Sequence, residues 1–163
     1  MKNSSKCDEI ATKIIPTFTF HELMQKIQYK KHEGIVIIHD GTNDVTHIFQ
    51  KYYMSEAAKL VECERLAKKL SDFMEKLCNA NPNALFMISK ILPRFDSEKL
   101  RNAGDLINSV ISDKLKDIPN IFLIYNDYLD NVKYFQNDGY HLTSFAFSKL
   151  LQKWSFCITS FTG

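Results

Sequence analysis

Short, continuous runs of hydrophobic residues alternate along this chain with longer segments in which hydrophobic residues recur at helical spacing. The runs are GIVIIH at 34–39, ALFMIS at 84–89 and IFLIY at 121–125, with a weaker candidate, TKIIP, at 12–16. Uninterrupted hydrophobic runs of this length are typical of strands covered on both faces of a parallel sheet. We therefore predict buried parallel strands at these positions.

The segments between the runs predict helices. Hydrophobic residues three and four apart occur within 21–29, from Ala57 to Leu77, from Leu100 onward and again after His141. Ser55 and Ser97 stand just before two of these segments, and serine is a favoured N-cap residue. Strands that alternate with helices indicate an α/β fold, here a three-layer α/β/α sandwich around a parallel sheet.

Composition favours one soluble domain. The 163 residues are 45% hydrophobic, and the formal net charge of +2 gives no basic excess of the kind that nucleic-acid-binding proteins carry. We predict a loose N-terminus at 1–10, a single domain at 11–156 and a C-terminal tail at 157–163. No run is long enough to span a membrane, and we expect a cytoplasmic protein.

The cysteines do not form a recognisable site. They are widely spaced and include no CxxC pair, so reduced packing residues are a better interpretation than a zinc site or disulfides. The four are Cys7, Cys63, Cys78 and Cys157. We predict neither a metal nor a cofactor.

The strand at 34–39 ends in a polar elbow, IVIIHDGTND. Ligands of open α/β sheets bind at the carboxyl ends of the strands, which is where this elbow lies. Gly41 permits a sharp turn, and the amide of Asn43 can donate a hydrogen bond to a developing oxyanion. Asp44 can cap the next helix or brace the loop. On its own the elbow is equally compatible with an ordinary turn, which favours the same residue types.

A second group of polar residues, NDGYH, precedes the last predicted helix. Asp138 and His141 are three residues apart, and in a tight loop this spacing brings a carboxylate to one imidazole nitrogen. The other nitrogen is then free to act as a base. Thr143 or Ser144 is expected to cap the helix. Read alone, this group too is compatible with a plain loop before a helix.

Together, GxND after a strand and DxxH before the final helix resemble the SGNH (GDSL-type) hydrolases, over nearly the whole chain after residue 10. The chain is most similar to the SGNH domains of retrotransposon-encoded esterases and their host relatives. The resemblance implies a flavodoxin-like sandwich and hydrolysis of an acyl or acetyl ester, with a small-molecule or lipid substrate. It makes Asn43 an oxyanion-hole donor within a loop shaped by Gly41, His141 the general base, and Asp138 its orienting partner.

Two features of that family are missing. No strand in the sequence ends in Gly-Asp-Ser, so the nucleophile is unassigned and the first central strand is expected to be absent; Ser4 and Ser5 lack that context. Thr17 occupies the position of an oxyanion glycine. We therefore expect weak or no hydrolase activity from this chain. The alternatives are a non-catalytic SGNH-like module that binds RNA or protein, and a transposon-derived fragment.

Overall fold

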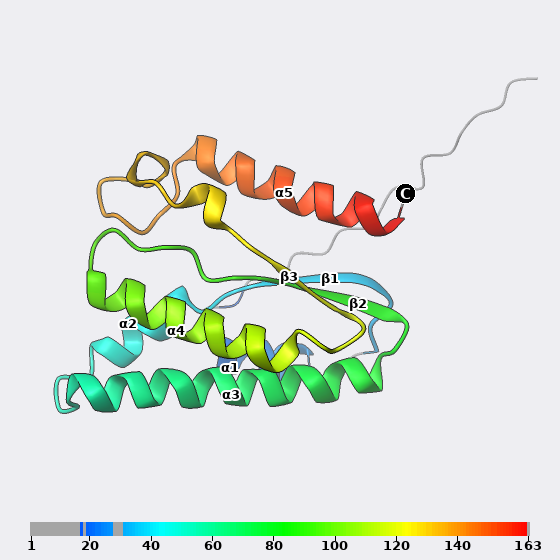
Figure 1. The fold of residues 1–163 in the computed structure, drawn as a ribbon, viewed down its shortest axis with the longest axis horizontal. Coiled ribbons are helices and arrows are strands. Elements are labelled where there is room, and N and C mark those ends of the chain that lie inside the picture. Colours follow the sequence, from blue (N-terminus) through cyan, green and yellow to red (C-terminus); the bar gives the residue numbers. More distant parts are fainter. Residues whose placement is uncertain (1–16, 18, 28–30, 163) are drawn as a thin grey trace, which may run out of the picture.

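The computed structural model describes residues 17, 19–27 and 31–162. In this part of the chain the sheet has three parallel strands in the order β1-β2-β3, with Gly34 opposite Ala84 and Phe86 opposite Ile121. The strands are β1 (Gly34–His39), β2 (Ala84–Ser89) and β3 (Ile121–Ile124) (Figure 1). The first two have the predicted bounds and the third is one residue shorter. The strand predicted at 12–16 lies outside the described residues.

Five α-helices accompany the sheet in the described residues, and two short 3₁₀ helices, η1 (Asp127–Leu129) and η2 (Val132–Tyr134), follow β3. Both predicted N-caps are confirmed: Ser55 Oγ accepts from the Ala58 amide at 3.1 Å, and Ser97 Oγ from the Leu100 amide at 3.4 Å. The helices are α1 (Phe20–Ile27), α2 (Thr42–Phe49), α3 (Glu56–Ala80), α4 (Glu98–Leu115) and α5 (Ser144–Thr162).

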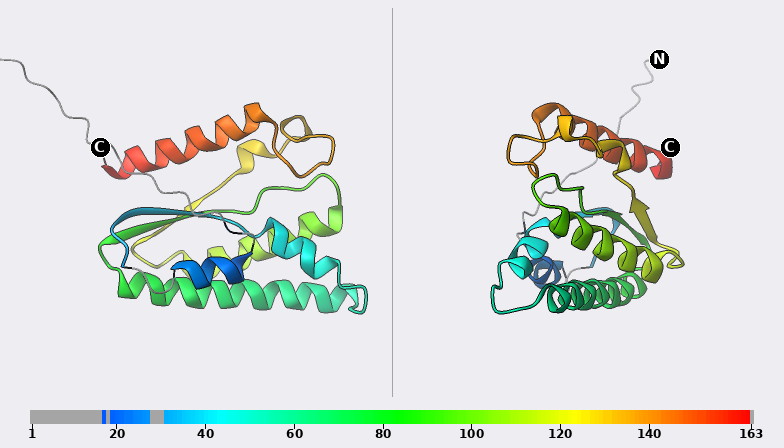
Figure 2. Two further views of the ribbon diagram at one scale, coloured as in Figure 1. Left: turned by 180° about the vertical axis from the view of Figure 1, so that it is seen from behind. Right: turned by 60° about the vertical axis from the view of Figure 1, so that its left-hand side comes forward.

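Helices lie on both faces of the sheet (Figures 1 and 2). The first four cover one face, and α5 crosses the other. The larger part of the core lies between the sheet and α1–α4, where Leu70, Phe86 and Ile107 are completely buried. A smaller cluster under α5 contains Met87, Ile124 and Cys157. The predicted α/β class is therefore observed, with a parallel sheet at its centre.

The C-terminal end differs from the prediction. Residues 157–162 are not a tail, because α5 continues through them to Thr162. Cys157 is buried against the sheet, and Phe161 stacks edge-on against Phe122 of β3 at 5.2 Å between ring centroids. The hydrophobic spacing of Trp154, Cys157 and Phe161 continues past 156 and favours one uninterrupted helix.

Three cysteines lie in the described part of the chain, and all are buried free thiols. Burial raises the pKa of both Cys63 and Cys78 to about 11, so at neutral pH these thiols are protonated and unreactive. Among the described residues, no helix combines the length and the apolar character needed to cross a membrane.

Candidate functional site

The elbow after β1 depends on glycine for two separate reasons. Gly41 is the N-cap of α2 and has φ 111°, a backbone conformation that side chains disfavour. A Cβ atom on Gly41 would also lie 2.6 Å from the Ile91 Cδ1 atom and 2.6 Å from the Phe20 Cζ atom. The glycine therefore lets the chain turn where α1 and the segment after β2 approach it most closely.

Asn43 lies in the first turn of α2, just beyond the carboxyl end of β1. Its side chain is exposed and makes no hydrogen bond within the described part of the chain. An exposed amide at this end of a parallel sheet is available to donate to a ligand.

Two carboxylates near Asn43 in the sequence accept hydrogen bonds from other parts of the protein and hold the segment before α2 in place. Asp40 accepts hydrogen bonds from the Thr17 hydroxyl at 2.7 Å and from the Gly41 amide at 2.8 Å. Asp44 accepts from the Phe20 amide at 3.0 Å, which ties the start of α1 to α2. Of the two roles predicted for Asp44, bracing is the one observed. Thr17, predicted to occupy the place of an oxyanion glycine, lies next to this elbow.

Burial is the main cause that raises the pKa of Asp44 to about 6; the hydrogen bond from Phe20 opposes this rise, and the nearby Asp40 adds to it. The folded state therefore binds more protons than the unfolded state between pH 4 and 6. It follows that the contribution of Asp44 to stability is present at pH 4 and is lost as pH rises through 6.

Replacing Asp44 by asparagine is expected to stabilise the protein at pH 7.5 and to change little at pH 4. A rise in pKa from 3.8 to about 6 corresponds to roughly 3 kcal/mol, of which we expect about 2 kcal/mol because the introduced amide must still accept from the Phe20 amide. Urea unfolding at both pH values measures the difference. The exposed Asp113→Asn in α4 serves as control and should change stability by less than about 0.5 kcal/mol. Equal effects of Asp44→Asn at the two pH values would contradict the assignment.

The second predicted group is assembled as expected. The Asp138 Oδ2 atom lies 2.5 Å from His141 Nδ1, and Oδ1 accepts from the backbone amides of Tyr140 and His141. These hydrogen bonds, first that from the His141 amide, lower the pKa of Asp138 to about 2. The ionised carboxylate favours a proton on Nδ1, which leaves the lone pair of Nε2 available on an exposed ring.

The loop that carries this pair is fixed at both ends. Gly139 has φ 78°, its carbonyl accepts from the Phe95 amide at 2.8 Å, and a Cβ there would lie 2.7 Å from the Asp96 nitrogen. On the other side, Thr143 Oγ1 accepts from the Ala146 amide at 3.2 Å, so Thr143 rather than Ser144 caps α5. The position of the His141 backbone is thus set by the segment that follows β2 and by the start of α5.

Arg94 joins the elbow to this loop. Its Nε and Nη2 atoms donate to the two carboxylate oxygens of Asp96 at 2.9 and 2.5 Å, and Nη1 donates to Thr46 Oγ1 of α2 at 2.6 Å. The guanidinium carbon lies 4.7 Å from the centre of the Tyr140 ring, next to His141. The sequence analysis did not single out Arg94, because a single arginine in a loop carries no local signal.

These contacts place the two predicted groups at the same end of the sheet, with Arg94 between them. They do not supply a nucleophile: among the described residues, no serine, threonine or cysteine side chain hydrogen-bonds to His141. The described residues also contain no cluster of three or more histidine, cysteine or carboxylate side chains arranged to hold a metal ion.

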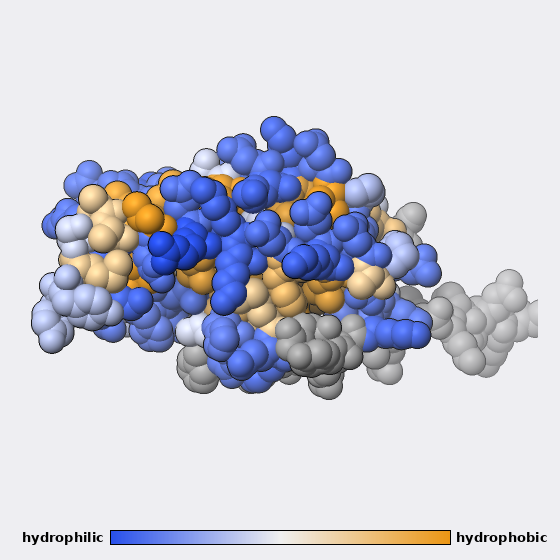
Figure 3. All heavy atoms as spheres, turned by 90° about the horizontal axis from the view of Figure 1, so that it is seen from below, coloured by the Kyte–Doolittle hydropathy of each residue, from blue (hydrophilic) through white to orange (hydrophobic). Residues whose placement is uncertain are grey.

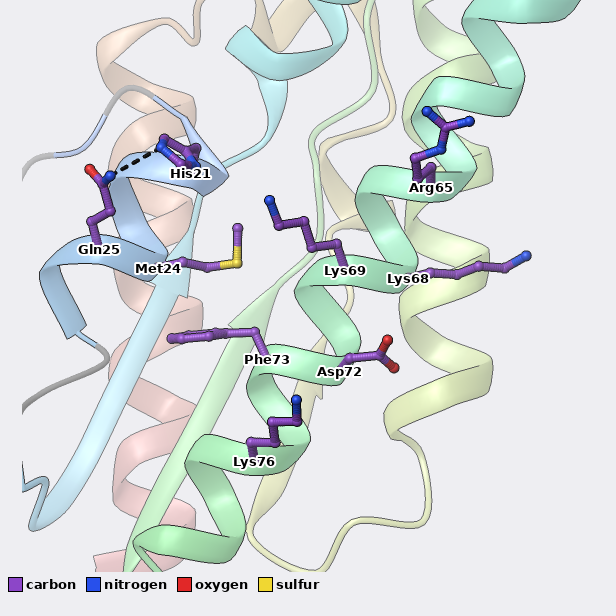
Figure 4. Close-up of a pocket in the computed structure, with 9 residues that line it drawn as sticks. All are labelled: His21, Met24, Gln25, Arg65, Lys68, Lys69, Asp72, Phe73 and Lys76. Carbon is purple, nitrogen blue, oxygen red and sulfur yellow. Dashed lines mark hydrogen bonds between the residues drawn. The ribbon is translucent and has the colours of Figure 1, made fainter.

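A separate groove of about 590 Å³ lies between α1 and α3, and none of the sequence-predicted site residues lines it (Figure 4). Lys69 and Phe73 reach from α3 toward Met24 on α1, whereas Lys68 and Asp72 point away. The groove is cationic over an apolar floor, on a face that is otherwise mostly hydrophilic (Figure 3). Its described lining residues are His21, Met24, Gln25, Arg65, Lys68, Lys69, Asp72, Phe73 and Lys76.

The cations of this groove differ in their partners. Arg65 pairs with Glu62 and Lys68 with Glu64 along the outer side of α3. Lys69 and Lys76 have no ion-pair partner in the described part of the chain, and the two flank Phe73 along the helix.

Comparison with known proteins identifies no related family or protein. No protein-family model matches the chain, and a search of curated proteins finds no match. The function is therefore inferred from the residues and their geometry.

Proposed function

We propose that this chain is an ester hydrolase domain of the SGNH type that cleaves acyl or acetyl esters. In this proposal His141 is the general base, Asp138 holds its ring, and Asn43 donates to the oxyanion from a loop shaped by Gly41. The observation that carries the proposal is the 2.5 Å contact between Asp138 and His141 Nδ1, which leaves Nε2 exposed at the end of the sheet that bears the elbow.

The strand order supports the same proposal. A flavodoxin-like sheet has the order 2-1-3-4-5, and three consecutive strands that pair side by side in parallel match its strands 3, 4 and 5. In that scheme Gly41 and Asn43 follow strand 3, Arg94 follows strand 4, and the Asp138–His141 loop precedes the last helix.

The chemistry of the pair determines the expected rate. With water as nucleophile, Nε2 of His141 takes a proton as the water oxygen attacks the ester carbonyl, and Asn43 stabilises the resulting oxyanion. When the tetrahedral intermediate collapses, the imidazolium returns that proton to the departing alcohol. Without a covalent acyl intermediate, only part of the power of a complete triad is available. We therefore propose a weakly active domain.

The test is hydrolysis of p-nitrophenyl acetate. The purified chain should act barely above background, and His141→Ala should remove that activity, whereas the exposed His21→Ala should not. Adding an upstream strand that ends in Gly-Asp-Ser should raise turnover, and Asn43→Ala should then lower it by roughly 10²–10³-fold. A gain that survives His141→Ala, or no gain in any folded extended variant, would overturn the proposal.

The alternative function is a non-catalytic binding module, and the α1–α3 groove is the observation that favours it. Unpaired ammonium groups on both sides of an aromatic ring are suited to a single-stranded RNA, whose phosphates and bases require such partners. Under this alternative, a fluorescent oligouridine binds in a salt-dependent way, Lys69→Gln with Lys76→Gln weakens binding, and His141→Ala does not. Absence of binding at low salt eliminates this alternative and leaves the hydrolase proposal intact.

A further inference from the structure

A buried serine links three elements beneath α5. Ser89 is the last residue of β2, and its Oγ atom lies 3.0 Å from His39 Nδ1, at the end of β1. The same oxygen lies 3.1 Å from Asn126 Nδ2, in the segment after β3, and 3.3 Å from Trp154 Nε1 of α5. Ser89 and Asn126 are both almost completely buried. The proposed ester-hydrolysis mechanism uses none of these four residues.

The orientation of the Asn126 amide follows from its partners. One amide hydrogen is donated to the Lys90 carbonyl at 2.7 Å, which only a donor can satisfy, so the nitrogen must lie on this side. The second hydrogen is then donated to Ser89 Oγ. The opposite atom, Asn126 Oδ1, is buried and has no hydrogen-bond partner among the described residues.

Counting donors fixes the proton of the serine. A hydroxyl oxygen has two lone pairs and one hydrogen, and the indole of Trp154 and the amide of Asn126 are both obligatory donors to it. The serine hydrogen is therefore donated to His39 Nδ1. This requires an unprotonated Nδ1, so His39 is neutral and carries its proton on Nε2.

We propose that this cluster is a pH-dependent latch that holds α5 on the sheet. Protonation places a hydrogen on Nδ1 of His39, which then donates to Ser89 Oγ instead of accepting from it. The serine oxygen would face three donors and has lone pairs for two. The contact from the indole of Trp154, at 3.3 Å the longest of the three, is then the one that breaks. Acidification thus weakens the contact that holds the middle of α5.

The surroundings of His39 give the direction of the pH effect. Burial lowers the pKa of His39, and a hydrogen bond with the Ser89 backbone opposes the shift in part. The latched state is therefore fully favoured above the ordinary pKa of 6.5 and is lost as pH falls below it. No charged group is among the causes of this shift. The charged residues next in sequence to the four residues of the cluster are Asp40 after β1, Lys90 after β2, Asp127 after β3 and Lys153 on α5.

The test follows α5 by amide exchange and Trp154 by fluorescence, since Trp154 is the only tryptophan of the chain. Between pH 7.5 and 5, exchange within 150–158, corrected for the intrinsic pH dependence, should accelerate at least about tenfold, and the Trp154 emission maximum should move to longer wavelength. His39→Asn keeps an uncharged acceptor near the Nδ1 position and should abolish both changes. The exposed His47→Asn on α2 is the matched control and should retain them.

Two outcomes would overturn the proposal: a wild-type α5 whose exchange is independent of pH, or a transition that persists in His39→Asn. If His39→Asn does not fold, the imidazole ¹⁵N shifts of the wild-type protein decide. At pH 7.5 they should show His39 with an unprotonated Nδ1, and a protonated Nδ1 would contradict the donor count.

Discussion

Replacing Gly41 by alanine should destabilise the protein by about 4–5 kcal/mol. Two costs combine at this position. The residue has φ 111°, and the new Cβ would lie 2.6 Å from side-chain atoms of both Ile91 and Phe20, closer than real Cβ contacts occur. Ile91 and Phe20 are themselves buried, so neither can move away without opening the core between α1, α2 and the segment after β2.

Gly34 and Gly104 separate these two costs. Gly34 has φ 75°, but a Cβ added there would meet no atom within 4 Å, so Gly34→Ala reports backbone strain alone, about 1 kcal/mol. Gly104 lies within α4 and its Cβ would meet Ile91 Cγ2 at 3.4 Å, an ordinary contact, so Gly104→Ala should be neutral or slightly stabilising. Urea unfolding of the three variants measures the differences. If Gly41→Ala costs no more than Gly34→Ala, the close approach at the elbow is not as described.

The parts of the fold that depend on local sequence signals were mostly predictable. The bounds of β1 and β2 follow from continuous hydrophobic runs, and the starts of α3 and α4 follow from Ser55 and Ser97, which act on amides three residues away. The Asp138–His141 contact was predictable for the same reason, because both residues lie within one tight loop. The prediction of a tail beyond 156 was wrong, because the hydrophobic spacing of α5 continues past that residue.

What could not be predicted depends on residues far apart in the sequence. Arg94 reaches Thr46 across 48 positions, and Trp154 reaches Ser89 across 65. Neither partner carries a pattern that identifies the other, since each is an ordinary residue until the sheet brings their segments together. The raised pKa of Asp44 is similar, because it results from burial under α1, which no property of the elbow itself reveals. The roles in hydrolysis proposed for Asn43 and His141 remain predictions.

Arg94→Met is expected to destabilise the protein by about 3–4 kcal/mol at neutral pH. Arg94 is 5% exposed and donates to both oxygens of Asp96, whose side chain is 23% exposed. Removing the guanidinium leaves that carboxylate poorly solvated, deprives Thr46 of a donor and removes the contact with the Tyr140 ring. The loss should also loosen the loop that carries His141, because Arg94 is the residue that joins this loop to α2.

The pH dependence of stability provides an independent check on the Arg94–Asp96 pair. Arg94 lowers the pKa of Asp96 mainly through its hydrogen bonds, so this pair contributes stability above the ordinary carboxyl pKa of 3.8 and loses it as pH falls. Arg94→Met should therefore cost less at pH 3 than at pH 7.

Arg101 provides the matched control for Arg94. It too binds both oxygens of an aspartate, Asp130, and lies over an aromatic ring, that of Phe95, but the two paired side chains are 32% and 42% exposed. Arg101→Met should therefore cost less than about 1 kcal/mol. Adding Asp96→Asn to Arg94→Met should recover about 1–2 kcal/mol, because the unpaired carboxylate is then removed. If Arg94→Met and Arg101→Met lower the free energy of unfolding equally, or if the double variant recovers no stability, burial does not give the Arg94–Asp96 pair the role described.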